Sequence, residues 1–412
     1  MTSPTNSPQP IAIVNARVLP IAGDPLERGT VLIRDGRIEA VGTDLAVPAD
    51  AVVIDATGKW VLPGFIEAHG HVGIDEEANG WAGNDTNEMT DPNMAGVRAI
   101  DAINIDDEGF RDALAGGITT IVVKPGSGNP IGGQTVAIKS WGGRTVDEQV
   151  VSESVSVKSA LGENPKRVYG DRTQTPSTRL GVSLVIRRAF VEARNYAEAR
   201  DAAELKNEPF TRDLGKETLA RVLSGELAWD QHVHRHDDIA TALRLADEFG
   251  YRLVINHGTE GHKLADVLAE RDIPVIFGPL FTSRTKVELR DRAIGNLVAL
   301  AAAGVRVAIT TDHPVVPINF LVHQASFAVK EGLPARVALE ALTVNPAVMM
   351  RLQDRVGSLT PGLDADVVVW SGDPLEITSR AELVLISGTP VYRWADGAGH
   401  VIERSERLSA RG

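Results

Sequence analysis

Short apolar runs alternate with helical patterns through the middle of the chain. The clear strand candidates are residues 64–71, 118–124, 251–257, 273–278 and 305–312, and the weaker ones are 134–140, 151–159 and 228–234. Between strands, apolar residues recur at helical spacing, as from Ile239 to Phe249, before a stop at Gly250. Strands that alternate with helices are typical of βα units and a parallel sheet. Eight of them predict an α/β fold, a (β/α)8 TIM-type barrel.

The two ends of the chain have a different pattern, in which β-rich runs are separated by turn residues. In the first 62 residues one such run is interrupted by Asp35-Gly36, a typical hairpin turn. The same pattern of β-rich runs and turn residues is found again near the C-terminus. We therefore predict a composite β-sandwich domain of residues 1–62 plus 355–412 and a hydrolase barrel of residues 63–354. The charged stretch 180–225 predicts an extended helical insertion in the barrel.

Composition narrows the partners and the chemistry. The 412 residues have a formal net charge of −13, spread along the sequence, which disfavours nucleic acid or an anionic membrane as partner. Without cysteine, any metal must be held by histidine, carboxylate or a modified side chain. The polar segment Met1–Pro10 does not resemble a signal peptide, and no apolar run approaches the roughly 18 residues of a membrane span. The expected location is the cytoplasm.

The first chemical signal is a pair of histidines, His69 and His71, at the end of an apolar run. Residues i and i+2 of a strand project from one face, so both imidazoles can reach one ion. Two unrelated surface histidines would give the same spacing, so the pair alone is a weak signal. It is strengthened by His232, His257 and Asp312, each at or near the end of a separate predicted strand. In a barrel these ends converge on one face, where catalytic residues are found.

With this set in view, the chain resembles the amidohydrolase superfamily over nearly its full length. The matching stretches are PGFIEAHGH, QHVHRHDD, VINHGTEG, AITTDHP and GSLTPGLDADVVVW. HGTEGHK, GPLFTSR and TTDHP are most similar to the imidazolonepropionase-like and prolidase-like branch. The resemblance implies one or two metal ions, with His69 and His71 on one and His232 and His257 on the other. It places Asp312 beside the attacking water.

The resemblance also implies a bridging ligand on the fourth strand, frequently a carboxylated lysine. Lys158, in SVSVKSALGENP, is the best match, and Glu163 is the alternative bridge. His234 is the alternative to His232, because both would share a face if the strand continued. The candidate substrate-binding residues are His234, His262, Arg284 and His313, and a solvated or structural role is open for each.

The expected activity follows from this ligand set. A divalent ion lowers the pKa of bound water from about 15.7 towards roughly 7. Asp312 would then move a proton from the nucleophile to the leaving group. We expect hydrolysis of an amide C–N bond, in a cyclic amide or small peptide-like substrate, by metal-bound hydroxide, and lactones are open to the same chemistry. Zinc is the first choice of metal, with manganese, iron or cobalt as alternatives.

Two other functions fit the sequence less well than amide hydrolysis. Heterocycle deaminases of the superfamily usually place a glutamate shortly after the fifth-strand histidine, whereas Val233 to His236 contain none. A non-catalytic scaffold would be expected to have lost its ligands. The glycine-rich run 126–134 lacks the Gly-Lys-Ser/Thr ending of a phosphate loop, so nucleotide binding is rejected. The expected partner is a small-molecule substrate, and a homo-oligomer is open.

Overall fold

The computed structural model describes residues 9–402, which contain ten α-helices and nineteen β-strands. Residues 1–8 and 403–412 lie outside this part, and with them most of the polar N-terminal segment and the last residues of the predicted composite domain. The helices are α1 (Glu108–Ala115), α2 (Glu163–Gly170), α3 (Arg179–Lys206), α4 (Leu214–Leu223), α5 (His236–Phe249), α6 (Ala265–Glu270), α7 (Gly295–Ala302), α8 (Leu321–Lys330), α9 (Ala335–Glu340) and α10 (Val344–Met349).

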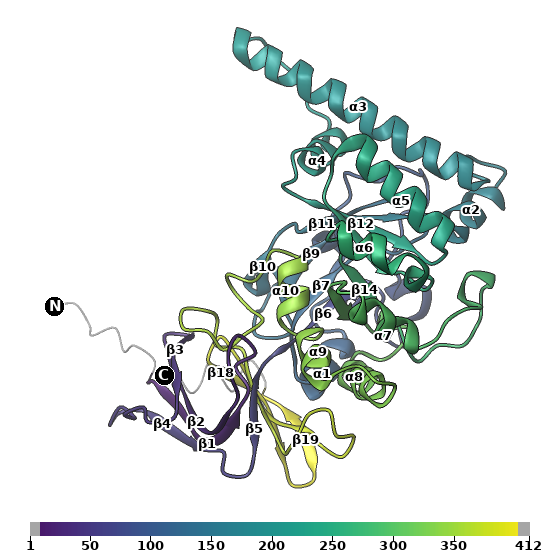
Figure 1. Ribbon diagram of the computed structural model, residues 1–412. Coiled ribbons are helices and arrows are strands. Elements are labelled where there is room, and N and C mark those ends of the chain that lie inside the picture. The colour runs from purple at the N-terminus through teal and green to yellow at the C-terminus, as the bar shows by residue number, and fades with distance from the viewer. Residues whose placement is uncertain (1–8, 403–412) are drawn as a thin grey trace.

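Strands from the two ends of the chain form one sheet of nine strands (Figure 1). They are β1 (Ile11–Val18), β2 (Leu26–Arg34), β3 (Arg37–Gly42), β4 (Val52–Asp55), β5 (Trp60–Pro63), β16 (Val367–Trp370), β17 (Ala381–Ile386), β18 (Thr389–Ala395) and β19 (Ala398–Val401). The junction is an antiparallel pairing of β5 with β16, in which Leu62 lies opposite Val368. Asp35 and Gly36, between β2 and β3, have φ of 50° and 77°, as a two-residue hairpin turn requires.

The middle of the chain forms two further sheets. Their strands are β6 (Phe65–Gly70), β7 (Ile118–Val123), β9 (Val136–Lys139) and β10 (Val150–Ser152) in one, and β8 (Ile131–Gln134), β11 (Ser156–Ala160), β12 (Ala228–Val233), β13 (Leu253–His257), β14 (Val275–Phe277) and β15 (Val307–Ile309) in the other. All pairings from β11 to β15 are parallel, and so is that of β6 with β7. The fold is a mixed α/β fold. Among residues 9–402, hydrogen bonds do not join the two central sheets into a closed barrel.

The run 134–140 departs from the prediction of a parallel strand. It forms β9, which pairs antiparallel with β7. A parallel return needs a crossover of a dozen or more residues, usually with a helix. The connection from β7 to β9 is rich in glycine and proline, has no α-helix, and contains β8, a short strand of the other central sheet. The chain therefore turns back beside β7 instead of crossing over.

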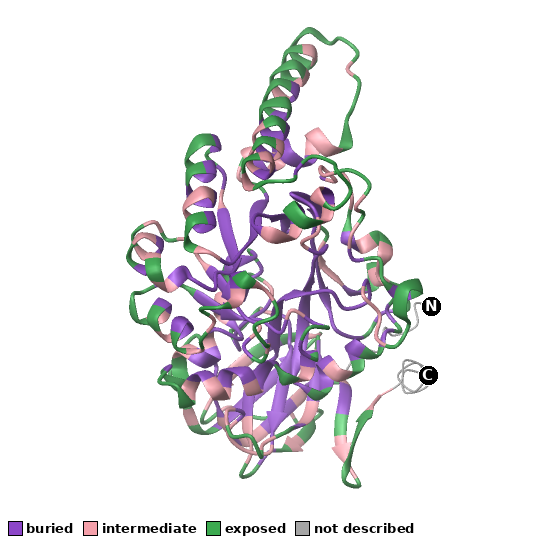
Figure 2. Cartoon of the chain, turned by 90° about the vertical axis from the view of Figure 1, so that its right-hand side faces the viewer, coloured by how far each residue is buried: buried purple, intermediate pink, exposed green. Residues whose placement is uncertain are grey.

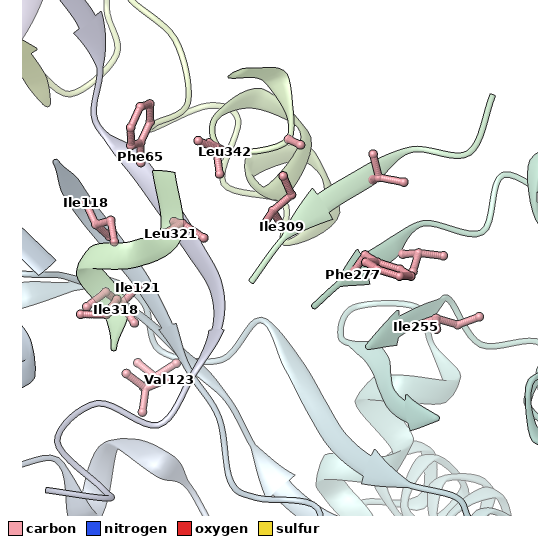
Figure 3. Packing of buried hydrophobic residues seen from close by; sticks show 14 of the residues in the cluster. Phe65, Ile118, Ile121, Val123, Ile255, Phe277, Ile309, Ile318, Leu321 and Leu342 are labelled. Carbon is pink, nitrogen blue, oxygen red and sulfur yellow. The ribbon is translucent and has the colours of Figure 1, made fainter. Parts of the chain in front are cut away.

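Alternation along the central strands divides their buried side chains into two sets. Small apolar residues from seven strands form one cluster, and they are Ile66, Ala68, Val122, Ala137, Ala228, Val254, Ile276 and Ala308. Their sequence neighbours, such as Phe65, Ile255 and Ile309, point to the opposite face and join the main core with residues of the surrounding helices (Figure 3). Burial is concentrated in these strands (Figure 2).

The predicted helical insertion is confirmed by α3 and α4, which follow β11 and α2. Helix α3 extends beyond the rest of the molecule at the top of Figure 1. The Thr178 side chain caps its first turn by accepting a hydrogen bond from the Gly181 N–H. Among the described residues, no helix is both long and apolar enough to cross a membrane.

Candidate active site

All six predicted ligands lie at or near the carboxyl ends of the central strands. His69 lies in β6 with His71 just after it, Lys158 in β11, His232 in β12, His257 at the end of β13, and Asp312 after β15. All of them except Lys158 line one cavity of about 350 Å³. Lys158 does not line the cavity but contacts this group, with Nζ 3.2 Å from His69 Nε2. The structure therefore brings together residues that are far apart in the sequence.

Hydrogen bonds donated by Nδ1 fix the orientation of three of these rings. The acceptors are Asn256 Oδ1 for His69 at 2.7 Å, the Lys124 carbonyl for His71 at 2.7 Å, and the Gly278 carbonyl for His257 at 2.8 Å. A carbonyl oxygen can only accept, so Nδ1 holds the proton of the neutral imidazole. The Nε2 atoms are thereby left without a proton, which is the usual arrangement of a histidine that binds a metal.

The group formed by His69, His71 and Asp312 fits a cation. Asp312 Oδ1 lies 3.2 Å from Nε2 of His69 and 3.3 Å from Nε2 of His71, and one potential ligand atom from each residue falls within 4.8 Å of the others. Burial, together with the charge of Lys158, lowers the pKa of His69 to about 3, so this imidazole is neutral. Lone pairs of nitrogen and oxygen thus face one another. A divalent ion between them would satisfy all three.

His232, His234 and His257 form an adjoining group, with ring centroids between 4.5 and 4.9 Å apart. His234 Nδ1 lies 2.8 Å from Thr259 Oγ1. His232 differs, because its buried Nδ1 has no hydrogen-bond partner among the described residues. Burial lowers the pKa of both His232 and His234 well below the usual range. A buried neutral imidazole nitrogen without a partner fits the role of a metal ligand and favours His232 over His234.

The two candidates for the bridging ligand lie in different surroundings. Lys158 is 1% exposed and donates hydrogen bonds to His69 Nε2 and the Pro125 carbonyl. Burial lowers its pKa to about 8, so about a tenth of the amine is unprotonated at pH 7, far more than for an exposed lysine. Glu163 instead begins α2 and lines a neighbouring depression on the surface. It does not line the main cavity.

Of the four candidate substrate-binding residues, only His234 lines the cavity. Arg284 is exposed and donates to two carbonyls of its own loop, those of Arg290 and Arg292. His313 is buried, with Nδ1 accepting from the Ile318 N–H, and His262 lies in the short helical turn after β13. The sequence alone does not reveal that Arg284 is exposed and bonded within its own loop.

Two of the strand-end residues have an unusual backbone conformation. His257 and Asp312 have φ of 68° and 53°, in the left-handed region that residues other than glycine rarely adopt. Such strain is commonly found at functional sites, where the surrounding structure enforces it.

Glu67 is a supporting residue that the sequence reasoning missed. It is fully buried and accepts hydrogen bonds from the N–H groups of His69 and Thr311 and from the hydroxyls of Thr310 and Thr311. It thereby ties β6 to the segment that presents Asp312. Its position two residues before His69, on the same strand face, was the available signal.

A second supporting group lies beneath His69. Lys124 Nζ is 2.6 Å from Asp230 Oδ2 and donates to Asn256 Oδ1, and all three residues are fully buried. The Asn256 amide also donates to Asp230. Because the same Asn256 oxygen accepts a hydrogen bond from His69 Nδ1, this network holds the His69 ring in its orientation. A buried lysine paired with an acid is the pattern of a structural ion pair rather than of a substrate contact.

Comparison with known proteins places this site in a family. The profile of the amidohydrolase family matches residues 187–392. A crystal structure of an amidohydrolase from Thermotoga maritima is 45% identical, covers 93% of this chain and 100% of its own, and superposes with a TM-score of 0.91.

The chain belongs to the amidohydrolase family.

Two curated relatives of this amidohydrolase are more distant. "Amidohydrolase tasK" of Hapsidospora irregularis is 29% identical over 88% of this chain, which spans only 40% of the length of that protein. An imidazolonepropionase of Sphingopyxis alaskensis is 25% identical over 88% of this chain and 93% of its own. Members of the family are hydrolases that act on C–N bonds and generally bind divalent metal. This amidohydrolase is an enzyme of that general kind, acting on a small-molecule substrate.

Proposed function

We propose that this amidohydrolase hydrolyses an amide C–N bond in a cyclic amide or a small peptide-like substrate, with lactones open to the same machinery. The observation that supports it best is the meeting of His69, His71 and Asp312 at one end of the cavity, next to His232 and His257. Two ions would be held by these side chains, with carboxylated Lys158 between them. Zinc is the first choice, because nitrogen and carboxylate ligands suit it.

When bound, a divalent ion lowers the pKa of water and polarises a carbonyl oxygen. The residues of the chain transfer the proton and hold the histidine rings in place. The Asp312 carboxylate accepts a proton from the attacking water at Oδ1 or Oδ2 and returns it to the leaving nitrogen. Asn256 and the Lys124 carbonyl keep the rings of His69 and His71 in the required orientation.

The architecture proposed for this function is a distorted (β/α)8 barrel of residues 63–354, with a β-sandwich domain of residues 1–62 plus 355–412. The single cluster of small apolar residues from seven strands supports a shared barrel interior. The pairing of β5 with β16 supports a composite sandwich.

Release of ammonia from a heterocycle is the alternative activity. Among the described residues, no glutamate lines the cavity, and the acids that do are Asp75 and Asp312. The acid expected shortly after His232 in a deaminase is thus missing from the site, which favours amide hydrolysis.

Metal content per chain tests the proposed centre. Elemental analysis of protein purified without chelators is expected to find two ions in the wild type, fewer in Lys158→Ala, and two in Glu163→Ala. One ion that is insensitive to either substitution would contradict the binuclear site and shift the screen from amides and lactones to heterocycles. Zinc-loaded protein that hydrolyses none of the cyclic amides, lactones and dipeptides in a panel would contradict the proposed activity.

A further inference from the structure

One wall of the cavity contains a lysine without an acidic partner. Lys286 lies in the loop between β14 and α7 and is half-buried. Its ammonium group donates to the side-chain oxygen of Asn164 at 2.8 Å. Within residues 9–402 no carboxylate oxygen lies within 4 Å of it, and this includes the two acids that line the cavity. Two hydrogen-bond donors of a charged group are therefore left for the cavity.

Two fully or nearly fully buried lysines of the central part, Lys124 and Lys139, are paired with acids, whereas Lys158 contacts His69 and a carbonyl. Lys124 pairs with Asp230 at 2.6 Å, and Lys139 pairs with Asp366 at 2.7 Å. An ammonium group removed from water normally has such a partner, because burying an unpaired charge is unfavourable. Burial lowers the pKa of Lys286, and the more distant carboxylates of Glu163, Asp312 and Glu288 offset this only in part. An anionic group of a ligand would supply the missing partner.

A short hydrogen-bonded chain connects this lysine with the candidate metal ligands. The Asn164 amide nitrogen donates to Ser127 Oγ at 2.7 Å and lies 3.4 Å from His232 Nε2. Two hydrogen bonds and the two bonds of the Asn164 amide thus link Lys286 Nζ to His232 Nε2. The atoms at the ends are no more than about 9 Å apart, given standard amide bond lengths. A small molecule can span this distance.

The loop that contains Lys286 is held in place by hydrogen bonds of a neighbouring residue. Two residues further on, Glu288 is buried and accepts hydrogen bonds from the Glu163 N–H and the Arg179 guanidinium. These contacts tie the loop to α2 and α3. The lysine is thereby presented at a defined position, as specific recognition of a small ligand requires.

We propose that Lys286 binds a carboxylate group of the substrate, so that the preferred substrates are small amides with a free carboxylate close to the scissile bond, such as N-acyl amino acids. This inference rests on the proposed function, since it assumes that the scissile carbonyl lies at the histidines. A cavity of about 350 Å³ is near the lower end of ligand pockets, which agrees with a small substrate. Ser127, which lines the cavity and accepts a hydrogen bond from Asn164, offers its hydroxyl proton to the same group.

Paired ligands test the proposal. Binding to the zinc-loaded protein is measured by titration calorimetry for N-acetyl amino acids with small, aliphatic, aromatic and acidic side chains, each compared with its carboxamide. We expect at least one acid to bind the wild type roughly tenfold or more tightly than its amide, as a charge-assisted hydrogen bond would give. Lys286→Met should abolish this preference, and Lys286→Arg should retain part of it. Lys206→Met, at the exposed end of α3, is the matched control and should leave it unchanged.

The outcomes separate this inference from the proposed function. Equal or undetectable binding of acids and amides by the wild type overturns it, and so does a preference that persists in Lys286→Met. Hydrolysis of the amides without any preference for the acids would remove the inference and leave amide hydrolysis in place. Carboxylate-dependent binding without hydrolysis of any compound would do the reverse. Equal melting temperatures of the variants and the wild type show that each variant is folded.

Discussion

At the scale of single residues, Glu288 is a buried acid outside the ligand group. It is 2% exposed, and one of its carboxylate oxygens has no partner in the described part of the chain. Burial raises its pKa from 4.5 to about 7 despite the nearby Arg179. Because Glu288 holds the loop of Lys286 against α2, its protonation bears on the stability of the cavity wall.

Stability should therefore depend on the protonation of Glu288. The folded protein binds this proton more tightly than the unfolded chain, so the contribution to stability is full below pH 4.5 and is lost as the pH rises through about 7. Glu288→Gln, which cannot ionise, is expected to remove this part of the pH dependence of the melting temperature. Glu198→Gln, on the exposed surface of α3, is the control. Identical pH profiles of wild type and Glu288→Gln would refute the assignment.

The residues of the site were predictable to the extent that strand periodicity places them. His69, His71 and Asp312 follow apolar runs, so their convergence could be expected. Lys286 and Asn164 could not be found in this way, because they lie in a loop and at the start of a helix whose positions depend on tertiary contacts. Arg284 shows the same limit, since its direction is set by hydrogen bonds within its loop.

Among the elements, α3 packs against β12 through an aromatic cluster around Phe190, which is one of six buried residues of this helix. Phe190 is fully buried, with its ring centroid 4.7 Å from that of Trp229 in β12 and 5.0 Å from those of Phe249 and Tyr251. The next residue, Val191, is 49% exposed. The helix thus has one buried face and one solvent face, as its long charged sequence indicated.

Truncation of the buried contact should destabilise the protein far more than truncation of its neighbour. Phe190→Ala is expected to lower the free energy of unfolding by about 3–5 kcal/mol, because it leaves a cavity beside β12. Val191→Ala should change it by no more than about 0.5 kcal/mol. Urea unfolding followed by tryptophan fluorescence reports both, since Trp229 lies in the contact. Similar midpoints for the two variants would mean that α3 does not depend on Phe190.

The elements also show why their order was easier to predict than their pairing. Seven of the eight predicted strands of the middle part form as single strands, because short apolar runs between turn residues are a local signal. The run 151–159 is instead divided between β10 and β11, which belong to different sheets. The predicted direction of β9 was wrong, because it depends on whether the preceding connection contains a helix that crosses over, and this connection contains none. Apolar patterning within the strand is the same in either direction.

In the whole molecule, the nine-stranded sheet is fastened to the central part by a buried ion pair. Lys139 in β9 is 6% exposed and contacts Asp364 at 2.9 Å and Asp366 at 2.7 Å, just before β16. Lys59 forms a comparable pair with Glu382 at 2.7 Å, but at the surface of the sheet. The two pairs differ chiefly in their exposure to water.

Removal of the two lysines should therefore have unequal consequences. Lys139→Met leaves the buried Asp366 without a cation, although Asp364 keeps its pairing with Arg355 at 2.8 Å, and is expected to destabilise the protein by about 3 kcal/mol. Lys59→Met should change the stability by no more than about 1 kcal/mol. The measurement is the urea midpoint of each variant. If Lys139→Met matched Lys59→Met, the buried pair would not hold the two parts together.

The pairing of β5 with β16 has a consequence for biosynthesis. During translation β5 emerges early and can bond to β1, but its other edge remains open until the central part has been made and β16 follows. At about 5–20 residues per second this interval is on the order of tens of seconds. An unpaired strand edge is a template for association with other chains. Protection of the nascent N-terminal strands by a chaperone would thus be needed for longer than in a protein whose sheets form from neighbouring segments.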